Sequence, residues 1–163
     1  MPSSSLRPAR PADLDGIRAL LDRCDLPSGD LTPAHLSPFW VMPGSGDAPD
    51  GCVGLEPTAD GTLLRSLAVR PGRRGEGLGR RLLHAAEAWG RREETGPLYL
   101  LTTTAADYFR RHGYEAVARA ALPASIRQTE EAARLCPDSA TCMRKALTGP
   151  DPAAARASER GGR

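Results

Sequence analysis

The sequence predicts a mixed α/β domain, in which helices flank a central sheet. Short apolar segments with strand character alternate with turn residues, and two longer segments carry the apolar periodicity of amphipathic helices. A glycine-rich turn at residues 73–79 joins one strand to the second of these helices. A chain of 163 residues is long enough for one sizeable core and too short for two.

The N-terminal half is expected to contribute the first helix and the first strands. Residues 6–10 form a strand, and Pro11 begins a helix that reaches about Arg23, with an apolar face that recurs at helical spacing. A loop with one helical turn at residues 33–36 follows over residues 25–38. Three further strands are separated by turn residues at 44–51 and 59–61; these strands are 39–42, 52–57 and 62–69.

The C-terminal half is expected to complete the sheet. After the main helix come a buried strand at residues 97–102 and a short helix at 105–111, which Gly113 ends as a left-handed cap. A strand, a helix and a last strand follow, at residues 114–121, 124–135 and 140–147. We expect one domain over residues 6–147 between disordered termini, 1–5 and 148–163, because the tail is rich in Ala, Arg, Gly and Pro.

Composition argues against several function classes. The net charge is only +2 and the arginines are spread along the chain, so we expect no nucleic-acid partner. No apolar run approaches membrane length and residues 1–5 are polar, which predicts a cytoplasmic protein without a membrane partner. The four cysteines are irregularly spaced, as expected of free thiols, and no His or Cys spacing indicates a metal site.

The glycine-rich turn is the strongest functional signal. The free N–H groups and the dipole at a helix N-terminus attract an anion, and glycines at 75, 77 and 79 allow a phosphate to approach the backbone. A P-loop is excluded because Lys145 is the only lysine. The dinucleotide fingerprint is excluded because the spacing is G-x-G-x-G. The alternative is an ordinary strand-to-helix turn with basic neighbours.

The remaining pattern is R-x-x-G-x-G, formed by Arg74, Gly77 and Gly79. It resembles the acetyl-CoA signature of the GNAT N-acetyltransferases. The strand and proline break at residues 67–71 and the His112-Gly113-Tyr114 ending of the short helix resemble further landmarks of that family. The resemblance implies the GNAT fold, a mostly antiparallel central sheet whose two central strands splay apart between flanking helices.

The resemblance also implies acetyl-CoA as cosubstrate, with no metal. The pantetheine arm would lie in the gap between the splayed strands, against Leu67, Ala68 and Val69. The pyrophosphate would bind the turn and its neighbours, which are Arg73, Arg74, Gly75, Glu76, Gly77, Leu78, Gly79 and Arg80. For Arg80, a solvated helix face is an equal alternative.

Acetyl transfer to an amine needs few catalytic groups, because proximity supplies most of the acceleration. The Val69 N–H is expected to polarise the thioester carbonyl, and Glu56 is the first candidate for the base, with a surface strand-end glutamate as the alternative. The family often carries a tyrosine four residues before the cap glycine, but Phe109 occupies that position here. Tyr108 is a candidate substitute, although a core side chain is its favoured interpretation.

Arg65 and Arg127 are the candidate acceptor-binding residues. Arg65 shares a strand face with Leu67 and could bind a substrate carboxylate or arsonate-like group, while a structural salt bridge with Glu56 or Asp60 is as good an interpretation. Segments beyond residue 64 resemble the GNAT branch associated with bacterial arsenic-resistance operons. This implies a small-molecule amine acceptor, such as an organoarsenical or an amino-acid-like toxin. A homodimer is common in the family.

Two other functions stay open. The chain could be a catalytically silent GNAT scaffold that binds arsenic through thiols, with Cys136 and Cys142 as the candidate pair. It could also be an acetyltransferase that modifies protein N-termini or lysines. Replacing both cysteines would disable a thiol-based sensor and leave an acetyltransferase active.

Overall fold

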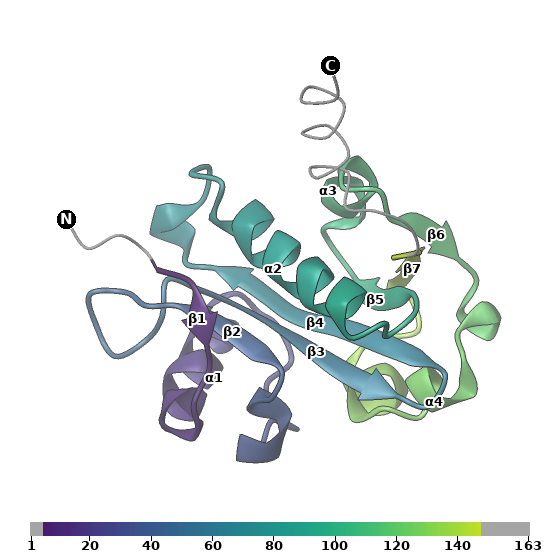
Figure 1. Ribbon diagram of the computed structural model, residues 1–163, viewed down its shortest axis with the longest axis horizontal. Helices are drawn as coiled ribbons and strands as arrows, with labels where there is room; N and C mark the ends of the chain where they lie inside the picture. Colours follow the sequence, from purple (N-terminus) through teal and green to yellow (C-terminus); the bar gives the residue numbers. More distant parts are fainter. Residues whose placement is uncertain (1–4, 148–163) are drawn as a thin grey trace.

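A seven-stranded sheet runs through the molecule in the order β1-β2-β3-β4-β5-β7-β6 (Figure 1). The computed structural model describes residues 5–147, so the expected disorder at 1–4 and 148–163 lies outside the described residues. All neighbouring strands are antiparallel except β4 and β5, which confirms the predicted mixed α/β fold. The strands are β1 (Arg7–Pro8), β2 (Phe39–Met42), β3 (Gly51–Thr58), β4 (Gly61–Val69), β5 (Leu98–Thr102), β6 (Glu115–Val117) and β7 (Thr141–Lys145).

Helices cover both faces of the sheet. The α-helices of the described residues are α1 (Leu14–Arg23), α2 (Leu78–Arg92), α3 (Ala106–Arg111) and α4 (Ala124–Arg127). Figure 1 shows α2 lying across β3 and β4. Alternate residues of β2 belong to different cores, because Trp40 and Met42 pack with α2 while Phe39 and Val41 pack with α1. Within residues 5–147 no helix has both the length and the apolar composition needed to cross a bilayer.

The predicted C-terminal elements are shorter in the structure. The helix expected over residues 124–135 ends at Arg127 and resumes as one π-helical turn, Glu131–Leu135. Thr129 explains the break, because its hydroxyl donates to the Ile126 carbonyl at 2.7 Å and accepts from the Ala132 N–H at 3.3 Å. The strand expected over residues 114–121 is reduced to β6, since a 3-10 turn follows at Arg119–Ala121.

A buried polar network ties α2 to the opposite end of the sheet. Glu87 of α2 accepts hydrogen bonds from the Tyr114 hydroxyl at 2.8 Å and from the Lys145 ammonium at 3.0 Å. Lys145 also donates to the His112 carbonyl at 2.8 Å and lies 5.5 Å from the centre of the Tyr114 ring. The only lysine of the chain is therefore structural.

The parallel pair β4 and β5 separates soon after it forms. The strands pair at Thr62 with Leu98 and at Leu63 with Tyr99. Beyond these two pairs β4 continues to Val69 and β5 to Thr102, but the described residues of the two strands no longer pair with each other. The separation agrees with the splayed strands that the family resemblance implied, and it positions the site.

Candidate active site

A cavity of about 920 Å³ opens where β4 and β5 separate. Its walls come from both strands, the glycine-rich turn, the loop after α1 and the segment after the π-helical turn. Its size is that of small-molecule pockets. All residues predicted to bind the cosubstrate line it except Glu76; they are Leu67, Ala68, Val69, Arg73, Arg74, Gly75, Gly77, Leu78, Gly79 and Arg80.

The glycine-rich turn has a backbone that side chains would disturb. Gly75 and Gly77 have φ values of 85° and 80°, in the left-handed region that glycine tolerates best. Gly77 is the N-cap of α2 and provides no side-chain cap, so a ligand can take up free N–H groups of the first turn. A Cβ atom at Gly79 would lie 3.0 Å from the Tyr108 hydroxyl.

Asp50 holds two arginines at the base of this turn. Its buried carboxylate accepts hydrogen bonds from Arg70 Nε at 2.9 Å and from Arg73 Nη1 at 2.5 Å. Arg73 also pairs with the exposed Glu76 at 3.0 Å. Arg74 donates from Nε to the Val69 carbonyl at 3.1 Å, at the end of β4. The turn is thereby fastened to β3 and β4 before any ligand arrives.

β4 is distorted where it borders the cavity. Its register with β3 shifts between Cys52 and Gly54, and Ser66 opposite this shift has a left-handed φ of 60°. The Cys52 thiol donates to the Ser66 carbonyl at 3.2 Å. Bulges and strained residues of this kind gather at functional sites. The bulge lies on the same strand as Val69, the predicted N–H donor to the thioester.

The Tyr108 hydroxyl is buried beside the turn and has no hydrogen-bond partner among the described residues. The ring contacts the main core, as predicted, with Phe109 at 5.4 Å and His112 at 4.6 Å between ring centres. The core interpretation fails for the hydroxyl, because Tyr108 lines the cavity and approaches Gly79. Burial raises the pKa of Tyr108, so it stays protonated at neutral pH.

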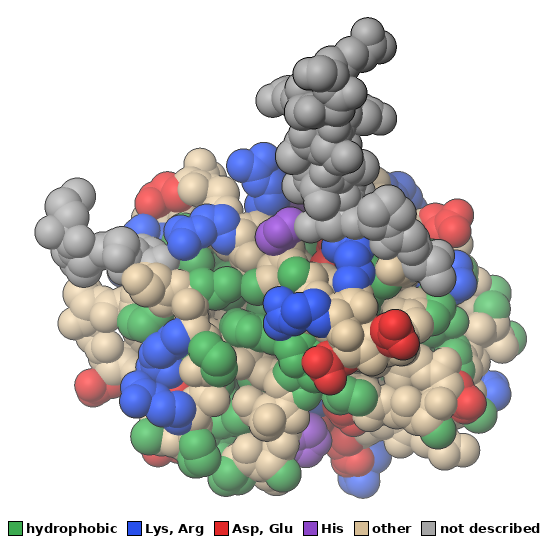
Figure 2. All heavy atoms as spheres, in the orientation of Figure 1, with side chains coloured by type: hydrophobic (Ala, Val, Ile, Leu, Met, Phe, Trp, Pro, Cys, Tyr) green, Lys and Arg blue, Asp and Glu red, His purple; other side chains and the backbone are tan. Residues whose placement is uncertain are grey.

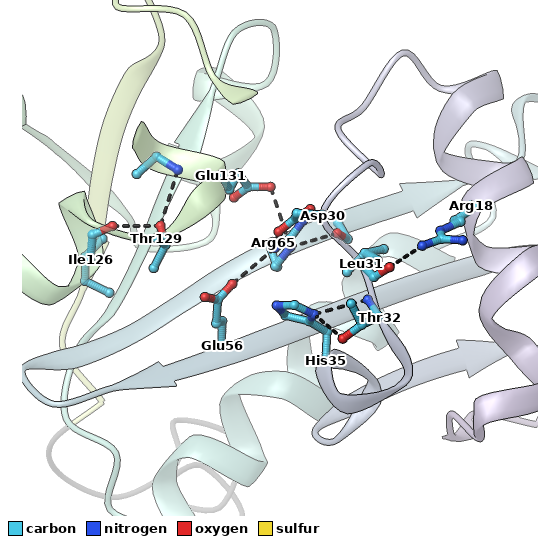
Figure 3. A network of polar contacts seen from close by, with 12 residues as sticks. Arg18, Asp30, Leu31, Thr32, His35, Glu56, Arg65, Ile126, Thr129 and Glu131 are labelled. Atoms are coloured by element: carbon cyan, nitrogen blue, oxygen red, sulfur yellow. Dashed lines mark hydrogen bonds and ion pairs between the residues drawn. The ribbon is translucent and has the colours of Figure 1, made fainter. Parts of the chain in front are cut away.

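The other end of the cavity holds a buried charge cluster around Arg65 (Figure 3). The Arg65 side chain is 1% exposed and donates to Asp30 at 2.5 and 2.7 Å and to Glu56 at 3.1 Å. Glu131 Oε1 lies 3.7 Å from Arg65 Nε. These side chains come from the loop before β2, from β3, from β4 and from the π-helical turn. We call Asp30, Glu56, Arg65 and Glu131 the acceptor-end cluster.

The groups of the acceptor-end cluster shift one another's pKa values. Burial works against the charge of Arg65, but the carboxylates around it raise its pKa and keep it protonated. Burial also opposes ionisation of Asp30, yet the hydrogen bonds from Arg65 hold the pKa of Asp30 below its usual value. Burial raises the pKa of Glu131 to about 7, against the opposing effect of Arg65. Glu131 is thus the member that titrates near neutrality.

The structure corrects the predicted substrate role of Arg65. Its guanidinium already serves three carboxylates, so the salt-bridge alternative describes it, with Glu56 as one predicted partner. Asp60 is the other predicted partner. Its backbone N–H donates a hydrogen bond to Ser125 Oγ at 3.1 Å, and its side chain forms no ion pair with Arg65. Arg127 is exposed and does not line the cavity, so the fold does not bring it to the site.

Sequence reasoning missed Asp30 and Glu131. Asp30 lies in a polar loop, and Glu131 was assigned to a continuous amphipathic helix. The available signal was Arg65 itself, because a buried guanidinium on an apolar strand requires several acidic partners. That signal gives the number and type of partners but not their positions.

Burial disfavours ionisation of the two candidate cysteines, and the possible metal ligands already make other contacts. Burial raises the pKa of Cys136, which lines the cavity, to about 11, and burial also raises the pKa of Cys142. Protonated thiols bind metals and arsenic poorly, which weakens the sensor alternative. Ligand atoms of Asp30, His35 and Glu56 lie within 4.8 Å of one another. Both of these carboxylates already bind Arg65, and His35 Nδ1 contacts Thr32 at 3.0 Å.

The face shown in Figure 2 carries Lys and Arg side chains at several separate places, interspersed with apolar and acidic ones. This distribution accords with the small net charge of +2.

Comparison with known proteins shows what the chain is similar to. Residues 36–116 match the family model described as an acetyltransferase (GNAT) domain, while no curated protein matches the sequence. N-acetylglutamate synthase from Neisseria gonorrhoeae, complexed with coenzyme A and N-acetyl-glutamate, is 23% identical with a TM-score of 0.75, over 89% of this chain and 35% of that chain. The chain thus spans about a third of the length of that synthase.

Two further solved structures are similar over nearly their whole length. An acetyltransferase of the GNAT family from Staphylococcus aureus is 16% identical with a TM-score of 0.69, over 88% of this chain and 99% of that chain. An aminoglycoside 6'-N-acetyltransferase complexed with coenzyme A is 18% identical with a TM-score of 0.67, over 90% of this chain and 99% of that chain. At these identities the similarity establishes a shared fold.

Proposed function

We propose that this chain, whose residues 36–116 match the model of a GNAT acetyltransferase domain, is an acyltransferase that transfers the acetyl group of acetyl-CoA to an amine of a small molecule. The separation of β4 and β5 carries the proposal, because it opens one continuous cavity from the glycine-rich turn to the acceptor-end cluster. A cosubstrate and an acceptor can therefore meet in one site, as direct transfer requires. Solved structures of the same fold contain coenzyme A, which supports the choice of cosubstrate.

In this proposal the glycine-rich turn binds the pyrophosphate. Arg74, Gly77 and Gly79 supply the motif, and the first turn of α2 offers N–H groups and the positive end of its dipole. Arg80 is exposed in that turn and adds a guanidinium. The pantetheine arm lies along the unpaired edge of β4, at Leu67 to Val69, where backbone groups can bond to its amides.

Two hydrogen-bond donors assist the transfer, one at the carbonyl oxygen and one at the sulfur of the thioester. The amine lone pair attacks the carbonyl carbon, and the Val69 N–H stabilises the negative charge that develops on the oxygen. The C–S bond then breaks, and the Tyr108 hydroxyl is the candidate donor to the departing thiolate. A thiol has an ordinary pKa of about 8.5 and leaves readily, so this donor contributes modestly.

The proposed acceptor is an amine of a small molecule. The arsenic-linked acceptors and the homodimer follow from sequence resemblance alone, and the cytoplasmic location follows from the polar residues 1–5 and the lack of a long apolar run. The contact predicted for a carboxylate or an arsonate is Arg65, which the structure shows bound to carboxylates. Glu56, the predicted base, does not line the cavity and reaches it only through Arg65.

Two measurements test the proposal. Calorimetry with acetyl-CoA measures cosubstrate binding, and release of free thiol in the presence of small amines measures transfer. Gly77→Ala should weaken binding, because Ala is strained at the φ of 80°, whereas Gly46→Ala provides a matched control at an open position. Failure of the wild-type protein to bind acetyl-CoA would refute the proposal.

A further inference from the structure

We propose that the acceptor pocket takes a cationic amine, and that Glu131 binds its ammonium group and receives its proton. This inference rests on the proposed function, since it names the acceptor class and the base for the same acetyl transfer. It is carried by the arrangement of hydrogen bonds in the acceptor-end cluster.

The first step is that Arg65 is already bound. Each of its three nitrogens donates a hydrogen bond, Nη1 and Nη2 to Asp30, Nη1 also to Glu56, and Nε to Ser66 Oγ at 3.3 Å. These bonds use four of the five N–H groups of Arg65, and an acceptor carboxylate would add a negative charge beside three existing carboxylates. The pocket is therefore built against anionic acceptors.

The second step is that Glu131 lacks a donor. Its carboxyl group is 4% exposed and lines the cavity, yet no hydrogen bond to it is formed within residues 5–147. Its one charged contact is Arg65 Nε at 3.7 Å, and that N–H points to Ser66 instead. Because Glu131 lines the cavity, a molecule in the cavity can donate hydrogen bonds to this carboxylate. A protonated amine offers three N–H donors and a positive charge.

The third step concerns the surrounding charges. The groups that face Glu131 are Arg65, Asp30 and Glu56, with the neutral Cys136 thiol nearby. Three carboxylates around one guanidinium leave an excess of negative charge, and burial holds the pKa of Glu131 at about 7. A base performs best when its pKa lies near the working pH, which suits Glu131 to removing a proton from an ammonium group.

The protons then balance. One ammonium proton passes to the Glu131 carboxylate, and the lone pair released on nitrogen forms the C–N bond. When the C–S bond breaks, the second proton on nitrogen is lost, and the coenzyme A thiolate gains one. Glu131 returns its proton to solvent through the cavity, so each turnover yields the amide, free coenzyme A and one proton.

The experiment compares acceptors of opposite charge. Thiol release is measured with 1,4-diaminobutane and with L-glutamate, while calorimetry separately measures acetyl-CoA binding. We expect a kcat/KM at least about 100-fold higher for the diamine, since the carboxylates of the acceptor-end cluster repel the carboxylates of glutamate. A protein that binds acetyl-CoA but prefers glutamate, or acetylates no cationic amine, overturns this inference and leaves the cosubstrate proposal standing.

Variants then test Glu131 itself. Glu131→Gln should lower kcat/KM for the diamine by about 10²–10⁴-fold and abolish the rise of kcat/KM with pH that we expect of wild type near pH 7. Glu130→Gln is the matched control, because Glu130 is exposed and pairs with Arg134; it should change kcat/KM less than about twofold. Glu131→Gln with wild-type kcat/KM and an unchanged pH profile would overturn the role of Glu131. Equal acetyl-CoA affinity of wild type and Glu131→Gln shows that the variant keeps the fold.

Discussion

The two ends of the cavity are built in opposite ways. The cosubstrate end is one continuous segment, residues 73–80, in which backbone conformation and glycine provide the binding surface. The acceptor end is assembled from Asp30, Glu56, Arg65 and Glu131, which come from four separate segments. In the proposed function, a cosubstrate shared by many enzymes would bind a local stretch of sequence, whereas the specific acceptor would meet side chains that only the fold brings together. Substitutions at each end should therefore have different consequences.

The largest effect is expected at Arg65. Arg65→Met removes the only guanidinium of the acceptor-end cluster and leaves three buried or half-buried carboxylates without compensation. Breaking such a network costs about 3–5 kcal/mol of unfolding free energy. Urea denaturation at pH 7 measures the loss, with the exposed Arg127→Met as control. A loss below about 1 kcal/mol would mean that the cluster is not a structural centre.

The next effect is expected at the cosubstrate end. Gly77→Ala places a Cβ atom at a left-handed residue, which costs about 1–2 kcal/mol. If the turn relaxes to avoid this strain, the first N–H groups of α2 move and the dissociation constant for acetyl-CoA rises by about tenfold. Calorimetry measures the change. Unaltered affinity would indicate that the turn is not the pyrophosphate site.

The pH dependence of stability separates the two ends further. The pKa of Glu131 is about 7 when folded and 4.5 ordinarily, so between these values the folded protein holds more protons than the unfolded chain. Stability therefore falls as pH rises from 4.5 to 7 because of this group. Glu131→Gln removes that loss and should stabilise the protein at pH 8 by on the order of 1 kcal/mol, or about 2–4 °C in Tm. A lower Tm than wild type at pH 8 would contradict the assigned pKa.

The smallest effect is expected at Tyr108, between the two ends. Tyr108→Phe removes a hydroxyl that has no protein partner, so folding should be nearly unchanged. If that hydroxyl protonates the thiolate, kcat falls by about tenfold or less while acetyl-CoA affinity stays constant. Tyr114→Phe is an informative contrast, because its hydroxyl bonds to Glu87 and its loss should lower stability rather than kcat.

The same contrast explains what the sequence could predict. The β2 strand was predicted with its observed bounds, because its apolar residues face a core on each side of the sheet. The turn at 73–79 was predicted because its glycines carry conformational information locally. The prediction of a helix over residues 124–135 was wrong beyond Arg127. There the Thr129 hydroxyl donates to the Ile126 carbonyl and interrupts the regular backbone hydrogen bonds of the helix. The acidic partners of Arg65 were missed because nothing near Asp30 or Glu131 marks them as neighbours.

Lys145 carries a consequence for the chemical behaviour of the protein. An acetyltransferase works beside a reactive thioester, which acylates exposed neutral amines without any catalyst. The single lysine amine here donates hydrogen bonds to Glu87 and to the His112 carbonyl, so two of its N–H groups are engaged within the fold. Within the described residues the one lysine side chain is therefore engaged in hydrogen bonds, which should slow its self-acetylation.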